Sequence, residues 1–322
     1  MLSPCAVVPP ELDGAIVSTH YFLFEYDSGV LDPGFLTWYL RSDRFQSQIR
    51  AQGSTNYAAI RPSDVLGYEL LLPLLSEQRR VSRALDRLLG IIERARRFTT
   101  TDTGLVGAYL GELFGDPYRS KPGTLRVAGW GPLDRLVSDV ADGPHQTPIY
   151  TTEGVPFVTA LNVAPGQLTF APVKFISLEQ HRVFQRRARA EAGDVLITKD
   201  GTIGLACTVD TDADFSFFVS VALVKPRPDV LDGGFLKWLI RAPATQRRIR
   251  ERARGDMIKH LVLREIRALL CPALPLEVQQ ATVADIERVA ALELRLQGIR
   301  QLQKRDLDAL VPKALSVVFG DG

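Results

Sequence analysis

Two stretches of the chain place apolar residues at alternating intervals of three and four. In the first stretch, residues 76–117, the apolar positions are Val81, Leu85, Leu88, Ile92 and Ala95. In the second stretch, residues 276–322, they are Val289, Leu292, Leu296, Ile299 and Leu302. This spacing is typical of helices that pair through one apolar seam. We therefore expect two long helices that pack against each other in antiparallel orientation.

The two predicted helices have recognisable breaks. A polar cluster at residues 99–104 interrupts the first helix. Pro312 kinks or ends the second, because proline removes one hydrogen bond from a helix. A helix of about 25 residues spans about 37 Å, so the pair could act as a spacer of that length. The alternative is an ordinary pair of bundle helices.

Short apolar runs between turn-forming residues predict a compact sheet of about six strands. The runs are residues 155–158, 168–170, 174–176, 195–198, 202–209 and 217–224. Residues 235–254 have a helical pattern that is broken near Pro243. The predicted fold class is therefore α+β: small mixed-sheet domains linked by two long α-helices that pair as an antiparallel coiled coil.

The most informative of these runs is GDVLITKDGTIG at residues 193–204. Asp200 and Gly201 are the pair that a two-residue type I′ hairpin turn prefers, because both central residues need positive φ. Lys199 would then lie beside the turn, and Gly204 would mark a bulge or a close backbone approach. Such a turn could press Lys199 against an anionic surface. The alternative is an ordinary surface hairpin.

The chain contains an internal repeat, which changes the interpretation of these elements. The segment LDPGFLTWYLR at residues 31–41 recurs as LDGGFLKWLIR at residues 231–241. The agreement extends to LPLLSEQ against LPLEVQ at the start of each long helix, and to LFGDP against VFGDG at its end. Residues 118–212, which contain the hairpin, have no counterpart in the first copy.

The repeat therefore predicts four segments. They are a partial first sheet domain (1–75), a first long-helix region (76–117), a complete second sheet domain (118–275) and a second long-helix region (276–322).

Composition is ordinary for a soluble protein of two domains, with 322 residues, 46% hydrophobic and 24% charged. We expect a cytoplasmic protein without a membrane segment, since the apolar runs are short and no leader pattern is present. Cys5, Cys207 and Cys271 lack CxxC spacing, which disfavours disulfides and a zinc site.

The formal net charge is only +2, so any affinity for nucleic acid must come from local patches. One such patch is present, because residues 237–260 hold eight basic side chains against two acidic ones. The alternative interpretation is a solvated helix face.

Motifs for catalysis are missing. The sequence has no GxxxxGK[ST] loop, no HExxH and no GxSxG. The four histidines lack metal-ligand spacing, and only His145, in the loop DGPHQTP, lies among groups that could bond a ligand. Its alternative role is to bond its own backbone. Asp194 and Asp200 are explained by turns, so we expect a protein that is not an enzyme.

The hairpin, the DGPH loop, the PLLSEQRRV start of the first long helix and the two-copy layout together resemble the specificity subunit of type I restriction-modification systems. The resemblance covers essentially the whole chain. It implies two target-recognition domains, each followed by a long helix, that read the two halves of a split DNA sequence. The paired helices set the gap between the halves.

The same resemblance implies partners and an absence of cofactors in this chain. Double-stranded DNA, methyltransferase subunits and a restriction motor subunit would be the partners, with no membrane involved. S-adenosylmethionine, ATP and magnesium would be bound by those other subunits, which carry out methylation and cleavage.

Loop residues are the expected DNA contacts, with basic side chains on phosphates and other polar groups on base edges. In the second copy they are Lys199, Asp200, Gly201, Thr202, His145, Gln146, Thr147, Arg248, Lys259 and His260. In the first copy they are Ser54, Thr55, Asn56 and Arg61.

The sequence departs from the family at its start, because a full member would have a counterpart of residues 118–212 ahead of Asp13. A truncated or silent reading frame, a natural fragment that pairs with another, and a start codon placed too late all remain open. The functional alternatives are a half-site binder, a coiled-coil adaptor, or part of a fused adenine methyltransferase. The last is disfavoured because the Asn-Pro-Pro-aromatic motif and a glycine-rich cofactor loop are missing.

Overall fold

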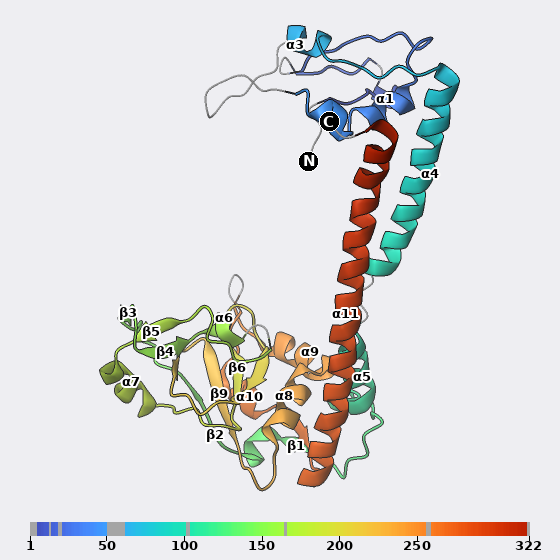
Figure 1. The fold of residues 1–322 in the computed structure, drawn as a ribbon. Coiled ribbons are helices and arrows are strands. Elements are labelled where there is room, and N and C mark those ends of the chain that lie inside the picture. Colours follow the sequence, from blue (N-terminus) through green and yellow to red (C-terminus); the bar gives the residue numbers. More distant parts are fainter. Residues whose placement is uncertain are drawn as a thin grey trace. The chain divides into compact units, whose positions relative to one another are not determined.

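The computed structural model describes residues 5–12, 14–18, 21–49, 62–100, 104–163, 166–255 and 259–320, without the side chains of 10 and 98–100. The chain forms two compact units. Unit 1 comprises Met1–Asp102 and Leu296–Gly322, and unit 2 comprises Thr103–Arg295. The long helix α11 (Leu276–Phe319) contributes its first part to unit 2 and its last part to unit 1 (Figure 1).

Unit 2 contains two small four-stranded sheets. The first has the order β2-β9-β6-β7, and all its pairs are antiparallel. Its strands are β2 (Val137–Asp142), β9 (Val221–Pro226), β6 (Val195–Thr198) and β7 (Ala206–Thr208). The second has the order β3-β5-β4-β8, with a parallel pair between β4 and β8. Its strands are β3 (Tyr150–Thr151), β5 (Lys174–Ile176), β4 (Val155–Val158) and β8 (Ser216–Phe217).

The remaining elements of unit 2 surround these sheets. A short pair joins β1 (Trp130–Pro132) to β10 (Leu270–Pro272). The α-helices are α5 (Leu105–Phe114), α6 (Ala160–Val163), α7 (Leu178–Gln185), α8 (Gly233–Arg241), α9 (Pro243–Arg252) and α10 (Leu263–Arg267). Two 3-10 helices are η2 (Pro117–Arg119) and η3 (Leu133–Arg135).

The sequence predictions for unit 2 are confirmed in part. The helical break at Pro243 is confirmed, because Pro243 is the first residue of α9. The predicted single sheet is wrong, since the strands form two sheets. The predicted strand at 168–170 is also wrong: the buried Asn162 donates its amide to the carbonyl oxygen of Thr169 and holds these residues in a loop.

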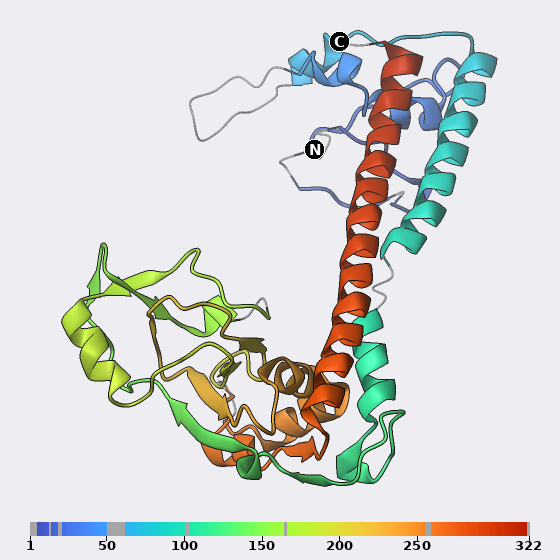
Figure 2. The same cartoon turned by 60° about the horizontal axis from the view of Figure 1, so that its bottom comes forward.

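Unit 1 is built from helices. They are the 3-10 helix η1 (Pro10–Leu12), α1 (Pro33–Tyr39), α2 (Asp43–Gln46), α3 (Pro62–Leu66), α4 (Leu75–Thr100) and the last part of α11. Leu85 of α4 and Leu315 of α11 share one core cluster, and Arg96 pairs with Asp308 at 2.5 Å further along. Because positions rise along α4 while they fall along α11, the helices are antiparallel, and Figures 1 and 2 show them side by side.

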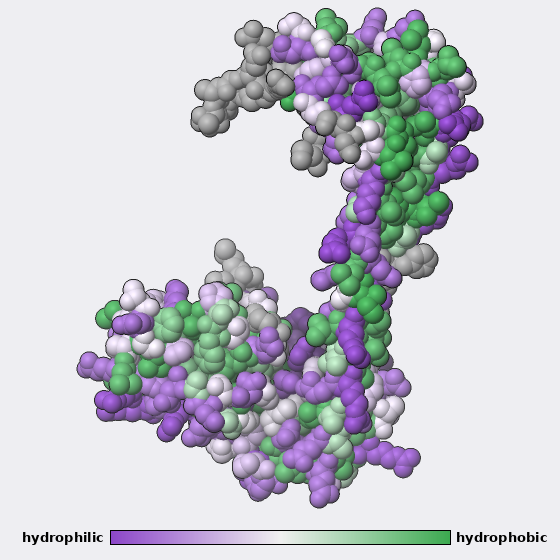
Figure 3. Space-filling model, viewed as in Figure 1, coloured by the Kyte–Doolittle hydropathy of each residue, from purple (hydrophilic) through white to green (hydrophobic). Residues whose placement is uncertain are grey.

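The predicted seam of the second helix is wrong in detail. Leu292, Ile299 and Leu302 are each 50–56% exposed, whereas Leu315 and Phe319 are buried. On the face shown in Figure 3, apolar side chains follow α4 and α11. The alternative that Pro312 ends the helix is also wrong, because α11 continues through it to Phe319.

A buried glutamine organises the start of each long helix in the same way. Gln78 is the fourth residue of α4, and its side-chain amide is fully buried. Its oxygen accepts from the backbone N–H of Asp32, while its nitrogen donates to the carbonyl oxygens of Val30 and Pro73 at 2.8–2.9 Å. Asp32 in turn caps α1 by accepting from the N–H of Phe35. One side chain thus ties three segments of unit 1 together.

Gln279, the fourth residue of α11, repeats this arrangement in unit 2. It accepts from the N–H of Asp232 and donates to the carbonyl oxygens of Val230 and Leu274 at 2.8–3.0 Å. The tryptophans also correspond, because Trp38 donates to Asp86 and Trp238 donates to Glu287. The sequence repeat is therefore a repeat of the same hydrogen bonds.

Each unit completes its core with an aromatic residue from the other copy of the repeat. In unit 1 the ring of Phe319, from the end of the second copy, meets the rings of Phe35 and Tyr39 edge-on at 5.4 Å. In unit 2 the ring of Phe114, from the end of the first copy, meets Phe235 edge-on at 5.6 Å.

Replacing the buried glutamine should destabilise the fold. Gln279→Ala leaves three partly buried backbone groups without their side-chain partner, so we expect the free energy of unfolding to fall by about 3 kcal/mol. Urea unfolding followed by tryptophan fluorescence measures this change. The control is Gln297→Ala on the exposed face of α11, which should change stability by less than about 0.5 kcal/mol. Equal effects of the two substitutions would contradict the assignment.

The Phe319 contact predicts a change that is local to unit 1. Phe319→Ala removes a ring that is only 2% exposed, which should cost about 3–5 kcal/mol. Hydrogen exchange should therefore accelerate in α1 and remain unchanged in β9. Val317→Ala, at a position that is 87% exposed, is the control. Unchanged exchange in α1 would show that the ring contact does not hold unit 1.

Candidate nucleic-acid interface

The candidate site lies at one end of the first sheet, where strands β2 and β6 end and strand β9 begins. The predicted two-residue turn is wrong, because β7 begins only at Ala206 and the connection from Thr198 is a longer loop. Gly201 and Gly204 have φ of +74° and +81°, whereas Asp200 does not have positive φ. Thr198 closes the loop, since its carbonyl oxygen accepts from Gly204 and its hydroxyl from Leu205.

Gly204 fits the predicted close approach, although its neighbour is a helix. The side chains of Gln246 and Ile249 on α9 lie within 3.3 Å of the place where a Cβ would be. Gln246 also donates to the carbonyl oxygen of Gly204 at 2.7 Å. The loop after β6 is thereby fixed against the basic helix α9.

The tip of the loop pairs with a distant segment. Asp200 forms a backbone bridge with His260, and the N–H of Gly201 donates to the carbonyl oxygen of Lys259 at 3.2 Å. A second bridge joins Arg254 to His260. The side chains of His260 and Asp200 are in contact as well, with Nδ1 2.7 Å from Oδ1.

Lys199 is turned inward. Its ammonium group lies 3.3 Å from a carboxylate oxygen of Asp142, and only 12% of its side chain is exposed. Asp142 is also bound by Arg187, whose Nη2 lies 2.6 Å from Oδ1, and it faces His145 at 3.6 Å. Burial by itself would raise the pKa of the Asp142 carboxyl, but Arg187 and Lys199 hold that pKa below its ordinary value.

The structure brings together residues from three of the predicted neighbourhoods. Lys199, Asp200, Gly201 and Thr202 share the loop after β6, His145, Gln146 and Thr147 follow β2, and Lys259 and His260 pair with the loop tip. Arg248 instead stacks over the ring of Tyr118 at 5.4 Å. Ser54, Thr55, Asn56 and Arg61 lie outside the described residues. All these DNA contacts remain predictions.

Sequence reasoning missed the residues that hold these loops. In the sequence, Asp142 stands out only as part of the DGPH loop, and Arg187 has no local signal because α7 and the sheets set its position. Arg250 and Arg254 belong to the basic run at residues 237–260, which gives neither of them an individual signal. Together with Lys259 they are exposed, and within the ranges described above their charged groups contact no acidic side chain.

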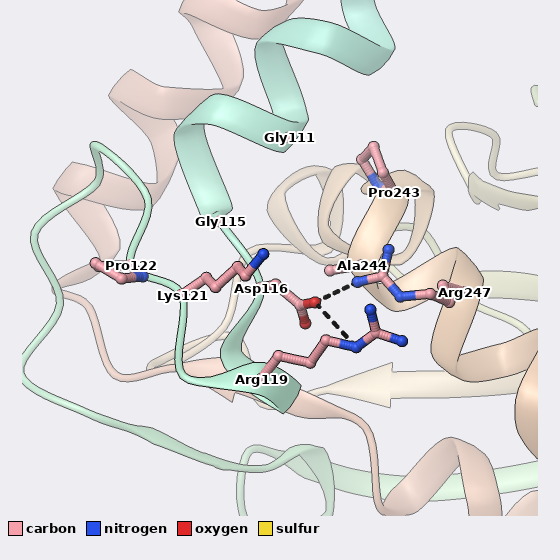
Figure 4. A pocket seen from close by; sticks show the side chains of 9 residues that line it. All are labelled: Gly111, Gly115, Asp116, Arg119, Lys121, Pro122, Pro243, Ala244 and Arg247. Carbon is pink, nitrogen blue, oxygen red and sulfur yellow. Dashed lines mark hydrogen bonds and ion pairs between the residues drawn. The ribbon is translucent and has the colours of Figure 1, made fainter.

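A second basic cluster lies where α5 ends and α9 begins (Figure 4). Asp116 binds Arg247 and lies 3.8 Å from Arg119, beside a cavity of about 390 Å³. Since the carboxylate is almost buried and links η2 to α9, we assign it a structural role.

Over the described ranges, no helix combines the length and apolar character that crossing a bilayer requires.

The fold of the chain is similar to that of solved structures. No family model and no curated protein matches the chain. A structure of a type I restriction-modification system, described for its complex assembly and conformational transition, is 24% identical with a TM-score of 0.76. The match covers 98% of this chain and 78% of that one.

A second solved structure gives the same picture. The HsdS subunit from Thermoanaerobacter tengcongensis is 24% identical with a TM-score of 0.59, over 98% of this chain and 77% of that one. Likenesses at this level of identity establish the fold. The chain therefore has the fold of the specificity subunits of type I restriction-modification systems.

Proposed function

We propose that this protein is the DNA sequence-recognition subunit of a type I restriction-modification complex and that unit 2 reads one part of a bipartite duplex site. The observation that carries the proposal is that three loops lie together at one end of the first sheet. These are the loop after β2, the loop after β6 and the segment at Lys259 and His260. The fold shared with specificity subunits supports it independently.

The charges around these loops suit a duplex. Arg250, Arg254 and Lys259 are exposed basic groups that can bind phosphates and fix the register of the protein on DNA. Asp200, Thr202, His145 and His260 offer donors and acceptors of the kind that read base edges in the major groove. The same cluster can therefore supply both affinity and discrimination.

We further propose that this chain is not catalytic and that methylation and cleavage belong to partner subunits. S-adenosylmethionine would then be bound by methyltransferase subunits, and ATP and magnesium by a restriction motor subunit. Support comes from the first structural neighbour, which concerns the assembly of a type I complex. Binding of S-adenosylmethionine by the isolated chain would favour a fused methyltransferase instead.

A half-site reader is the second candidate. All ten strands of the described residues belong to unit 2, whereas the described part of unit 1 is helical or irregular. Among the described residues, sheets are therefore found in unit 2 and not in unit 1, which supports recognition by unit 2. A footprint confined to one half-site would favour this candidate over the bipartite reader.

The basic patch gives a test of DNA binding. We expect Arg250→Ala and Lys259→Ala each to weaken binding to all duplexes and to reduce the slope of log K against log salt by about 1. Fluorescence anisotropy at several salt concentrations, with the methyltransferase subunit present, measures both. Arg288→Ala, at an exposed position on α11, should leave the slope unchanged. Absence of any footprint on genomic fragments would rule out the proposed function.

The close approach at Gly143 tests whether the loop after β2 is held in place. A Cβ at this position would lie 1.9 Å from the carbonyl oxygen of Phe217, so Gly143→Ala must displace the loop. We expect a loss of about 1–3 kcal/mol in unfolding free energy and weaker DNA binding. Gly129→Ala, where nothing lies within 4 Å, is the matched control. A Gly143 variant as stable as the control would contradict the close contact.

A further inference from the structure

The ion pair between Lys199 and Asp142 connects strands that are not neighbours. Asp142 is the last residue of β2, Lys199 follows the last residue of β6, and β9 lies between them. Strands one apart in a sheet are about 10 Å away from each other. The lysine side chain therefore crosses the start of β9, and the N–H of Lys199 donates to Ser220 just before that strand.

Arg187 fixes the other side of the same carboxylate. It follows helix α7 and makes two bonds to one residue: Nη2 binds the Asp142 carboxylate at 2.6 Å, and Nε donates to the Asp142 carbonyl oxygen at 3.1 Å. Ser216 of β8 contacts His181 of α7, so this helix is itself tied to the second sheet. Asp142 thus joins the two sheets and the loop after β6.

Both side chains of the ion pair are largely buried. The Asp142 side chain is 7% exposed and Lys199 is 12% exposed. A buried charge without a partner has a high free energy, so breaking this ion pair would be strongly unfavourable for both groups. Lys199 is consequently committed to Asp142 and is not offered to a phosphate.

We infer that Asp142 is a positioning residue that fixes the spacing between the loop carrying His145 and the loop tip at Asp200, and that it thereby sets sequence discrimination. The inference rests on the proposed function. It differs from it in assigning selectivity to a group that touches no DNA.

A positioning residue and a residue that contacts a phosphate should affect DNA binding in different ways. Phosphate contacts raise affinity for every sequence and appear in the salt dependence. A hydrogen bond to a base edge forms only when the distance between donor and acceptor stays within a few tenths of an ångström of its ideal value. A displaced loop therefore loses these bonds first. A positioning residue should therefore affect specific binding while leaving nonspecific binding and the salt slope unchanged.

The test uses the full chain with its methyltransferase partner and two duplexes. One duplex is the best sequence that the wild type selects from a randomised pool, and the other is a random sequence. Asp142→Asn keeps the shape and removes the charge. We expect binding to the selected duplex to weaken by about 10-fold or more. Binding to the random duplex should stay within about twofold, and the salt slope should not change.

Lys199→Met provides a second variant that leaves Arg187 on the carboxylate. It should show the same selective loss, and the double variant should lose less than the sum of the two, because the residues act as a pair. If Asp142→Asn does not fold, Lys199→Met alone decides the matter. A fall in the salt slope for Lys199→Met would show a phosphate contact and overturn the inference.

Equal losses on both duplexes, or unchanged selectivity in both variants, would also overturn it. Failure of the proposed function looks different, because the wild type itself would then select no duplex. The Arg250→Ala variant separates the two roles, since it should weaken both duplexes alike.

Discussion

The fold depends on a glutamine whose amide is buried at the start of each long helix. Gln78 and Gln279 each satisfy three backbone groups from segments that are far apart in the chain. Inside a protein these groups would be costly if left unpaired. The amide therefore fixes where the long helix begins relative to the short helix capped by aspartate.

Features that depend on neighbouring residues could be predicted from the sequence, whereas features that depend on residues distant in the sequence could not. The break at Pro243 could be inferred because the proline itself determines it. The apolar stripe of α11 was visible, but periodicity cannot tell which part of a stripe a partner covers, and Leu302 is 56% exposed. The hairpin turn was predicted from Asp200 and Gly201 alone, whereas pairing with His260 reshaped it.

The sequence named three loops that the structure places next to one another, but the electrostatics around them were not predictable. Lys199 looked like a cation for an external anion because its internal partner is distant in sequence. Only the strand order β2-β9-β6 brings Asp142 within 3.3 Å of it. Exposed basic residues on and after α9 add positive charge near these loops, and their sequence signal is a run rather than a motif.

The exchange of aromatic residues between the two copies has a consequence for synthesis. The core of unit 1 contains Phe35 near the start of the chain and Phe319 near its end. Helix α1 can form on the ribosome, but its apolar face has no closing ring until residue 319 has left the exit tunnel. The core of unit 1 is therefore completed only once residue 319 is available, although most of its residues are made earlier, and chaperone protection of the nascent chain would matter most for that half.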